Sequence, residues 1–170
     1  MRIMGIDTGS NGYLCELDVE EKTARYLAIP YRDDGVINGF KIEKAFEGFI
    51  NVHKTIIERV QGRGGNAKWG ATQNFGMGKN YGQILGLLHH VPITFVIPQT
   101  WQKKVHKNVK GITPKERSAS AFASLNPSFG DIKKSMNGLV DAFLIARWAL
   151  DEARVVYHDD WNFIDLEGQL

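Results

Sequence analysis

The order of the apolar segments along the chain constrains its fold more than any other feature of the sequence. Three apolar runs come first, and shorter runs then alternate with segments whose apolar residues recur at helical spacing. The expected strands cover residues 2–7, 13–18, 24–29, 55–60 and 92–97, the first three as an antiparallel meander. The expected helices cover residues 42–53, 78–90, a short stretch from 98, 113–126 and 136–153. Strands that come first and then alternate with helices predict an α/β fold around one mixed sheet.

The length of 170 residues predicts one domain. We expect a core over about residues 1–153 and a polar, aromatic tail over 154–170. Residues 61–78 are rich in glycine and show little periodicity, so they predict a long mobile loop.

Several features favour a cytoplasmic protein without a membrane partner. The apolar runs are far shorter than the roughly 20 residues of a membrane span. An acid, Asp7, lies within the first apolar stretch, which is not typical of a signal peptide. The single cysteine, Cys15, forbids an internal disulfide and fits a reducing compartment.

The net charge of +2 hides a strong segregation of charge along the chain. Residues 54–134 carry 13 Lys and Arg against three Asp and Glu, a net of +10, whereas residues 1–53 and 135–170 are acidic. Charge runs are commonly solvated surfaces, but aromatic residues are interleaved with this one. The basic middle therefore favours contact with nucleic acid.

Three acids occupy positions suited to metal chemistry. Asp7 and Glu58 end two apolar strands, where carboxylates point into the crevice used by ligands of α/β sheets. Asp141 lies within the apolar helical segment 139–146, where an acid is costly to bury unless it is paired or binds a metal. Asn137 lies one turn earlier on the same face. Oxygen ligands without a His–Cys set favour Mg²⁺ or Mn²⁺ over zinc.

The sequence resembles one known family over roughly residues 1–150. Residues 4–9, Met-Gly-Ile-Asp-Thr-Gly, are similar to the first-strand motif of the RuvC-like Holliday junction resolvases, in the ribonuclease H-like superfamily. Residues 56–61 resemble the strand that carries their second carboxylate. Residues 75–86, 98–104 and 138–146 match the later blocks, most closely in bacteriophage-type members.

This resemblance implies a ribonuclease H-like mixed five-stranded sheet flanked by helices. It implies an endonuclease that resolves four-way junctions, with other branched DNA as a further substrate class, and with two Mg²⁺ or Mn²⁺ ions per active site. Asp7, Glu58 and Asp141 become the metal-binding and catalytic acids, with Asn137 at a fourth metal position. Lys104 becomes the catalytic lysine near the scissile phosphate. A phage-encoded member acts in the cytoplasm of a bacterial host.

The resemblance also implies how DNA is bound. Relatives place an aromatic residue after the second carboxylate to probe the junction centre, and Trp69 or Phe75 fits that role; alternatively, Phe75 anchors the loop in the core. His106 is either a general acid or base, or a surface histidine beside lysines. The predicted DNA-binding residues are Arg63, Lys68, Trp69, Phe75, Lys79, Lys103, Lys104, Lys107 and Lys110.

Three glycines predict close packing of a helix. Gly78, Gly82 and Gly86 recur every four residues, so small side chains line one helical face. That face packs either against the chain's own sheet or, as in RuvC-like enzymes, against a second copy in a two-fold dimer. A four-way junction has two symmetric strands to cut, which favours a homodimer.

Position 137 departs from the pattern of the phage-like relatives, which usually carry an acid there. An asparagine offers an oxygen but no negative charge, so weaker metal binding and slower cutting are expected. Either the chain is a natural variant whose other three acids suffice, or the asparagine is a deliberate change that inactivates the enzyme.

Three other functions compete with a junction resolvase. A catalytically weak branched-DNA-binding protein and a ribonuclease acting on RNA–DNA hybrids both remain open. An actin-like ATPase, which starts with a similar motif, requires a second phosphate-binding loop of the Asp-Gly-Gly-Thr type, and the sequence contains none.

Overall fold

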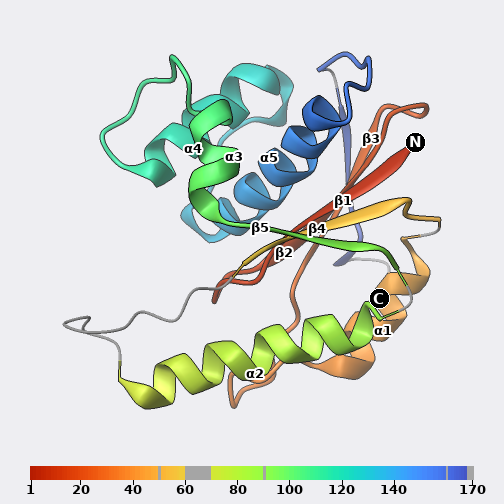
Figure 1. The fold of residues 1–170 in the computed structure, drawn as a ribbon, viewed down its shortest axis with the longest axis vertical. Coiled ribbons are helices and arrows are strands. Elements are labelled where there is room, and N and C mark those ends of the chain that lie inside the picture. The colour runs from red at the N-terminus through yellow and green to blue at the C-terminus, as the bar shows by residue number, and fades with distance from the viewer. Residues whose placement is uncertain (50, 60–69, 90, 160, 168–170) are drawn as a thin grey trace.

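The computed structural model describes residues 1–49, 51–59, 70–89, 91–159 and 161–167. Within these residues, six strands form one mixed sheet in the order β5-β4-β1-β2-β3-β6 (Figure 1). The strands are β1 (Arg2–Asp7), β2 (Tyr13–Asp18), β3 (Thr23–Ala28), β4 (Lys54–Glu58), β5 (Ile93–Val96) and β6 (Asn162–Asp165). The helices are α1 (Gly39–Glu47), α2 (Ala71–Leu87), α3 (Pro98–Val105), α4 (Pro114–Leu125) and α5 (Asn137–Glu152).

The first three strands form the antiparallel meander that the sequence predicted. The remaining strands add to the meander in parallel: β4 pairs with β1, β5 with β4, and β6 with β3. The mixed α/β sheet flanked by helices is therefore confirmed.

The sheet has a sixth strand that the sequence analysis did not predict. β6 comes from the tail that we expected to lie outside the core. Its Phe163 packs among the rings of Phe122, Phe129 and Phe143, with ring centroids 4.6–5.6 Å from its own. Trp161 is buried as well. A few aromatic anchors thus fold a mainly polar tail onto the sheet.

The helices cover the two faces of the sheet unequally (Figure 1). α1 and α2 cover one face, and α3, α4 and α5 cover the other. α5 is the central helix of its face, and most of its residues are buried. Among the described residues no helix is long and apolar enough to cross a membrane.

Two helix boundaries differ most from the prediction. α1 ends at Glu47, rather than at residue 53, because Gly48 takes the C-cap position. α2 begins at Ala71, so residues 71–77 are helical although we expected them in a loop. Glycines at 76 and 78 weaken a helix by about 1 kcal/mol each without ending it. Ile84, which is buried against the sheet, anchors α2 nearer its other end.

Alternation along β1 decides which side chains face α5. Ile3 belongs to the core under α5, while Met4 and Ile6 belong to the core under α1 and α2. Because successive side chains of a strand point to opposite faces, Asp7 faces α5 like Ile3. The same alternation in β4 places Ile57 on the α1–α2 side and Glu58 on the α5 side.

Two glycines allow α5 to lie directly on the sheet. A Cβ atom at Gly5 would lie 2.1 Å from the carbonyl oxygen of Ala142 and 2.7 Å from the backbone nitrogen of Ala146. A Cβ atom at Gly138 would lie 1.9 Å from the carbonyl oxygen of Asn11 in the β1–β2 turn. Any larger residue would force the helix away from the strand. These contacts fix α5 over the carboxyl end of β1.

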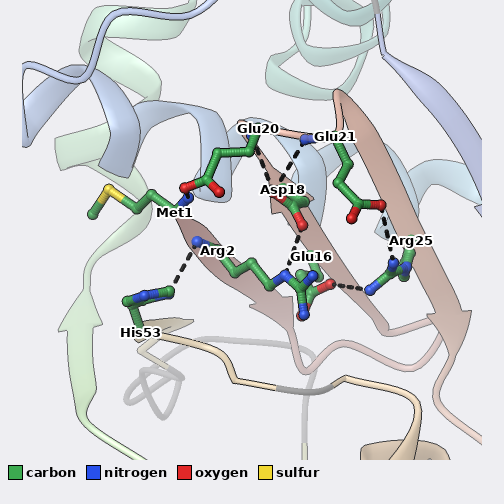
Figure 2. A network of polar contacts seen from close by, with 8 residues as sticks. All are labelled: Met1, Arg2, Glu16, Asp18, Glu20, Glu21, Arg25 and His53. Carbon is green, nitrogen blue, oxygen red and sulfur yellow. Dashed lines mark hydrogen bonds and ion pairs between the residues drawn. The ribbon is translucent and has the colours of Figure 1, made fainter.

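Ion pairs hold the opposite end of β1 (Figure 2). Arg2 pairs with Asp18 at 2.6 Å, and Arg25 pairs with the buried Glu16 at 3.2 Å. Both pairs join residues that are directly opposite each other on neighbouring strands. Burial raises the pKa of Glu16 to about 7 against the opposing effect of Arg25. This network ties β1, β2 and β3 together well away from Asp7.

Candidate active site

The three acids singled out in the sequence converge on one cavity. Ile6 lies opposite Ile57 in the parallel register of β1 and β4, so Asp7 and Glu58, each one residue further on, are neighbours at the carboxyl ends of these two strands. α5 brings Asp141 to the same place. The cavity has a volume of about 330 Å³ and is lined by Asp7, Gly9, Ser10, Asn11, Glu58, Lys115, Lys134, Asn137, Gly138 and Asp141.

Asp7 is held by the turn that follows β1. Its Oδ1 accepts a hydrogen bond from the backbone N–H of Gly9 at 2.9 Å. Burial, followed by the nearby charge of Asp141, raises the pKa of Asp7 to about 7, and Glu58 contributes in the same direction. The Gly9 hydrogen bond and the charge of Lys115 lower the pKa of Asp7.

Glu58 is held by a residue that the sequence analysis missed. The indole Nε1–H of Trp101 donates to Oε2 of Glu58 at 2.7 Å, and Trp101 itself is completely buried. Burial raises the pKa of Glu58 to about 7, although the Trp101 bond opposes the shift. The signal in the sequence was the motif Pro98-Gln99-Thr100-Trp101, but nothing in it shows which acid the indole contacts.

Asp141 is buried, and one of its carboxylate oxygens has no hydrogen-bond partner among the described residues. Burial raises its pKa to about 6, against the opposing effects of a hydrogen bond from Ser118 and the charge of Lys115. Its Oδ1 is buried and has no hydrogen-bond partner among the described residues. Ser118, which is buried on α4, is a second orienting residue that the sequence did not reveal.

The donor set fits a hard divalent cation. Three carboxylates and the amide oxygen of Asn137 offer only oxygen ligands, and the unpartnered Oδ1 of Asp141 is available to an ion. Among the described residues no group of three or more His, Cys, Asp or Glu side chains is arranged to hold an ion alone. Water would complete the coordination of an ion held here, as is common for Mg²⁺.

Two lysines, Lys115 and Lys134, line the cavity in place of the predicted Lys104. Lys104 forms an ion pair with Glu152 of α5 and borders a separate hollow with Arg147 and Asp151. The structure therefore does not bring Lys104 to the carboxylates, because this side of α3 faces the end of α5. Lys115 is in the first turn of α4, after a capping box of Thr113 and Glu116.

The other predicted DNA-binding residues lie in several places. Arg63, Lys68 and Trp69 lie outside the described residues. Phe75 is 74% exposed on α2, so it does not anchor a loop in the core. Four lysines are exposed outside the carboxylate cavity: Lys79, Lys103, Lys107 and Lys110.

The glycines of α2 face away from the sheet. Gly78, Gly82 and Gly86 are exposed, and a Cβ atom at any of them would meet nothing within 4 Å. Packing against the chain's own sheet, the alternative left open by the sequence, is thus excluded for these positions.

Comparison with known proteins places the fold. No protein-family model matches the chain, and no curated protein matches its sequence. Among solved structures, Thermus thermophilus RuvC in complex with a Holliday junction substrate has a TM-score of 0.64 at 18% identity, over 91% of this chain and 96% of that one. Another structure of Thermus thermophilus RuvC has a TM-score of 0.63 at 21% identity, with the same coverage.

A more distant match is the yeast mitochondrial Holliday junction resolvase Ydc2, with a TM-score of 0.50 at 14% identity over 90% of this chain and 80% of that chain. The chain therefore has the ribonuclease H-like fold of the RuvC resolvases, as its motifs predicted. At this level of identity the likeness establishes the fold.

The raised pKa values predict how metal and pH affect stability. An acid whose pKa is higher in the folded chain costs stability once it ionises. For Asp7 this cost is absent below about pH 4, grows as the pH rises, and is complete above about pH 7. In EDTA, Asp7→Asn should therefore raise the free energy of unfolding at pH 8 by about 1 kcal/mol, or roughly 2–4 °C in Tm, and much less at pH 5.

Thermal unfolding with EDTA or with MgCl₂ checks this expectation. Mg²⁺ should stabilise the wild type more at pH 8 than at pH 5 and should stabilise Asp7→Asn less. Asp33→Asn, which removes an exposed acid that does not line the cavity, is the matched control. An equal gain for Asp7→Asn at both pH values contradicts the electrostatic account.

Proposed function

We propose that the protein is a metal-dependent DNA endonuclease that resolves four-way junctions and cuts other branched DNA. The observation that carries this proposal is the cavity where Asp7, Glu58 and Asp141 meet, on a fold shared with RuvC. One of the matching RuvC structures is a complex with a Holliday junction substrate, and the yeast match is a junction resolvase. The basic middle of the chain supports a polyanionic substrate.

Asp7, Glu58 and Asp141, with the amide of Asn137, would hold Mg²⁺ or Mn²⁺, and the expectation of two ions is part of this proposal. Bound cations supply positive charge against that of the carboxylates and of the phosphate in the transition state. The three acids are oriented in advance by Gly9, Trp101 and Ser118. Such outer partners typically account for 10–100-fold in metal affinity or activity.

The two lysines of the cavity act on the phosphate. Lys115 and Lys134 line the same cavity as the carboxylates, where their ammonium groups can position a phosphodiester and offset its charge. We assign to Lys115 the role predicted for Lys104, since Lys115 also acts electrostatically on Asp7 and Asp141.

DNA binding outside the cavity is assigned to the exposed basic residues. Lys79, Lys103, Lys107 and Lys110 would contact backbone phosphates, giving affinity without sequence readout. Phe75 is exposed and could stack on an unpaired base. Arg63, Lys68 and Trp69 keep their predicted DNA-binding roles as part of this proposal.

A cleavage assay on a labelled four-way junction tests the proposed function. The wild type should cut the junction in Mg²⁺ or Mn²⁺ and not in EDTA. Asp7→Asn should lower the rate by at least about 100-fold while leaving junction binding intact, since it removes a metal-binding charge from the cavity. Asp33→Asn is again the control. Cleavage by Asp7→Asn at the parent rate contradicts the site.

The amide at position 137 favours one alternative, a branched-DNA-binding protein with weak or absent cleavage. Junction binding without cutting in either metal would support that function instead. Parallel assays on an RNA–DNA hybrid and on a linear duplex measure substrate choice. Faster cutting of the hybrid than of the junction would identify a hybrid ribonuclease.

Restoring an acid at position 137 should increase activity. Asn137 lines the cavity one turn before Asp141, so Asn137→Asp adds a negative charge beside the metal-binding oxygens. We expect a roughly tenfold or greater increase in the Mg²⁺-dependent cleavage rate, which corresponds to about 1.4 kcal/mol in the barrier. Equal or lower activity at saturating metal and DNA would show that residue 137 does not serve the metal.

The exposed glycine face of α2 supports a homodimer as part of the same proposal. Gly78, Gly82 and Gly86 let a second backbone approach closely, and Phe75 lies on the same helix. A two-fold pair presents one active site to each of the two strands cut at a junction.

Sedimentation checks the dimer. The wild type should sediment as twice the 19.1 kDa chain, and Gly82→Leu should shift it towards the monomer because the added side chain blocks close approach. Phe40→Ser, which removes another exposed apolar side chain outside α2, is the control. A wild-type monomer with and without junction DNA contradicts the dimer.

A further inference from the structure

A second cavity lies on the outer side of α3 and the start of α4. Its volume is about 350 Å³, and it is open to solvent. All the side chains that line it carry hydrogen-bond donors and none is acidic: Gln99, Gln102, Lys103, His106, Lys107 and Arg117. This composition suits an anion.

The cations of this cavity form no ion pair with an acid among the described residues. Within the described part of the chain, Lys104 pairs with Glu152, and Arg147 pairs with Asp151 and Asp159. No ion pair of the described residues involves Lys103, Lys107 or Arg117. The acid next to Arg117 in sequence, Glu116, is engaged by the backbone N–H groups of Ile112 and Thr113.

Arg117 also has an unused buried donor. Its Nε lies in the interior without a hydrogen-bond partner among the described residues. The charge of Arg117 acts on His106, whose pKa is lowered by burial first and by Arg117 second. An anion in the cavity would pair with the guanidinium.

The cavity is connected to the candidate active site through short contacts. Nε2 of His106 lies 3.0 Å from Oγ of Ser118, and Ser118 in turn hydrogen-bonds Asp141. The ring of His106 also packs edge-on against Trp101, which holds Glu58. One side of α3 and α4 thus faces the anion cavity while their other side orients two of the carboxylates.

We infer that this cavity binds a backbone phosphodiester of DNA, next to the one in the carboxylate cavity, with Arg117 as its principal contact. The identity of the anion as DNA rests on the proposed function. Arg117 lies two residues from Lys115 at the start of α4, so their Cα atoms are at most about 7 Å apart and this helix borders both cavities. An open groove lets a continuous strand cross, which a closed pocket for a small anion would prevent.

Two substitutions test the phosphodiester site by equilibrium binding in EDTA, with a linear duplex and a four-way junction over a range of NaCl concentrations. Arg117→Gln removes one phosphate contact, so the slope of log K against log [NaCl] should fall by about 1 for both DNAs. Gln102→Glu places a carboxylate beside the phosphate and should weaken binding roughly tenfold or more at low salt. Gln102 is only partly buried, so Gln102→Glu should fold normally and still tests the site if Arg117→Gln does not fold.

The matched controls are changes of the same charge elsewhere. Arg154→Gln removes an exposed arginine, and Ala123→Glu adds an acid on the exposed side of α4; neither lies at this cavity or at the carboxylate cavity. Both controls should bind DNA with the slope and affinity of the wild type. All variants should keep the thermal unfolding of the wild type.

The outcomes separate this inference from the proposed function. If both test variants bind DNA like their controls while the wild type cuts junctions, the phosphodiester site is overturned and the endonuclease stands. If the wild type cuts nothing but the test variants lose salt-dependent DNA binding, the site stands and the endonuclease fails. If calorimetry shows that Arg117→Gln loses inorganic phosphate while its DNA binding is unchanged, the assignment to DNA is overturned.

Discussion

The close approach of α5 to β1 is the contact on which the rest of the arrangement depends. At Gly5 the backbone of α5 occupies the space that a Cβ atom would need. Because α5 lies so near β1, its side chains come close to the carboxyl end of β1. Asp141 therefore reaches the acids of β1 and β4 without a long loop or a flexible side chain. The geometry of the three acids is set by backbone packing in the core, which is far stiffer than any surface contact.

The same packing creates an electrostatic conflict that the surroundings only partly relieve. Burial alone raises the pKa of each acid, and neighbouring negative charges add to the shift for Asp7 and Glu58. Single hydrogen bonds from Gly9, Trp101 and Ser118 oppose these shifts without cancelling them. Conflict of this kind is typical of functional sites, where stability is given up for chemistry. A bound cation would offset these buried negative charges. Replacing an acid by a hydrophobic residue would also remove the charge, but the oxygen ligand would be lost with it.

The sequence predicted the parts of this site that depend on local pattern. Period-two alternation locates Asp7 and Glu58 at strand ends, and an acid inside an apolar helix marks Asp141. The sequence does not show which side chains of α3 and α4 point towards the carboxylates. The lysines of residues 103–115 look alike in sequence, but only the folded chain shows that Lys104 meets Glu152 while Lys115 meets the carboxylates. The donors on Trp101 and Ser118 are hidden for the same reason, since their partners are distant in the chain.

The sixth strand, β6, determines which strand forms one edge of the sheet. β5 and β6 form its two edges, and each has only four residues, whereas β1, β2 and β3 have six. Short outer strands offer few unpaired backbone groups to another chain. Without β6, the six-residue β3 would become the rim and present a longer template for strand addition. The polar tail thus shields the sheet from edge-to-edge aggregation, a protective role unrelated to catalysis.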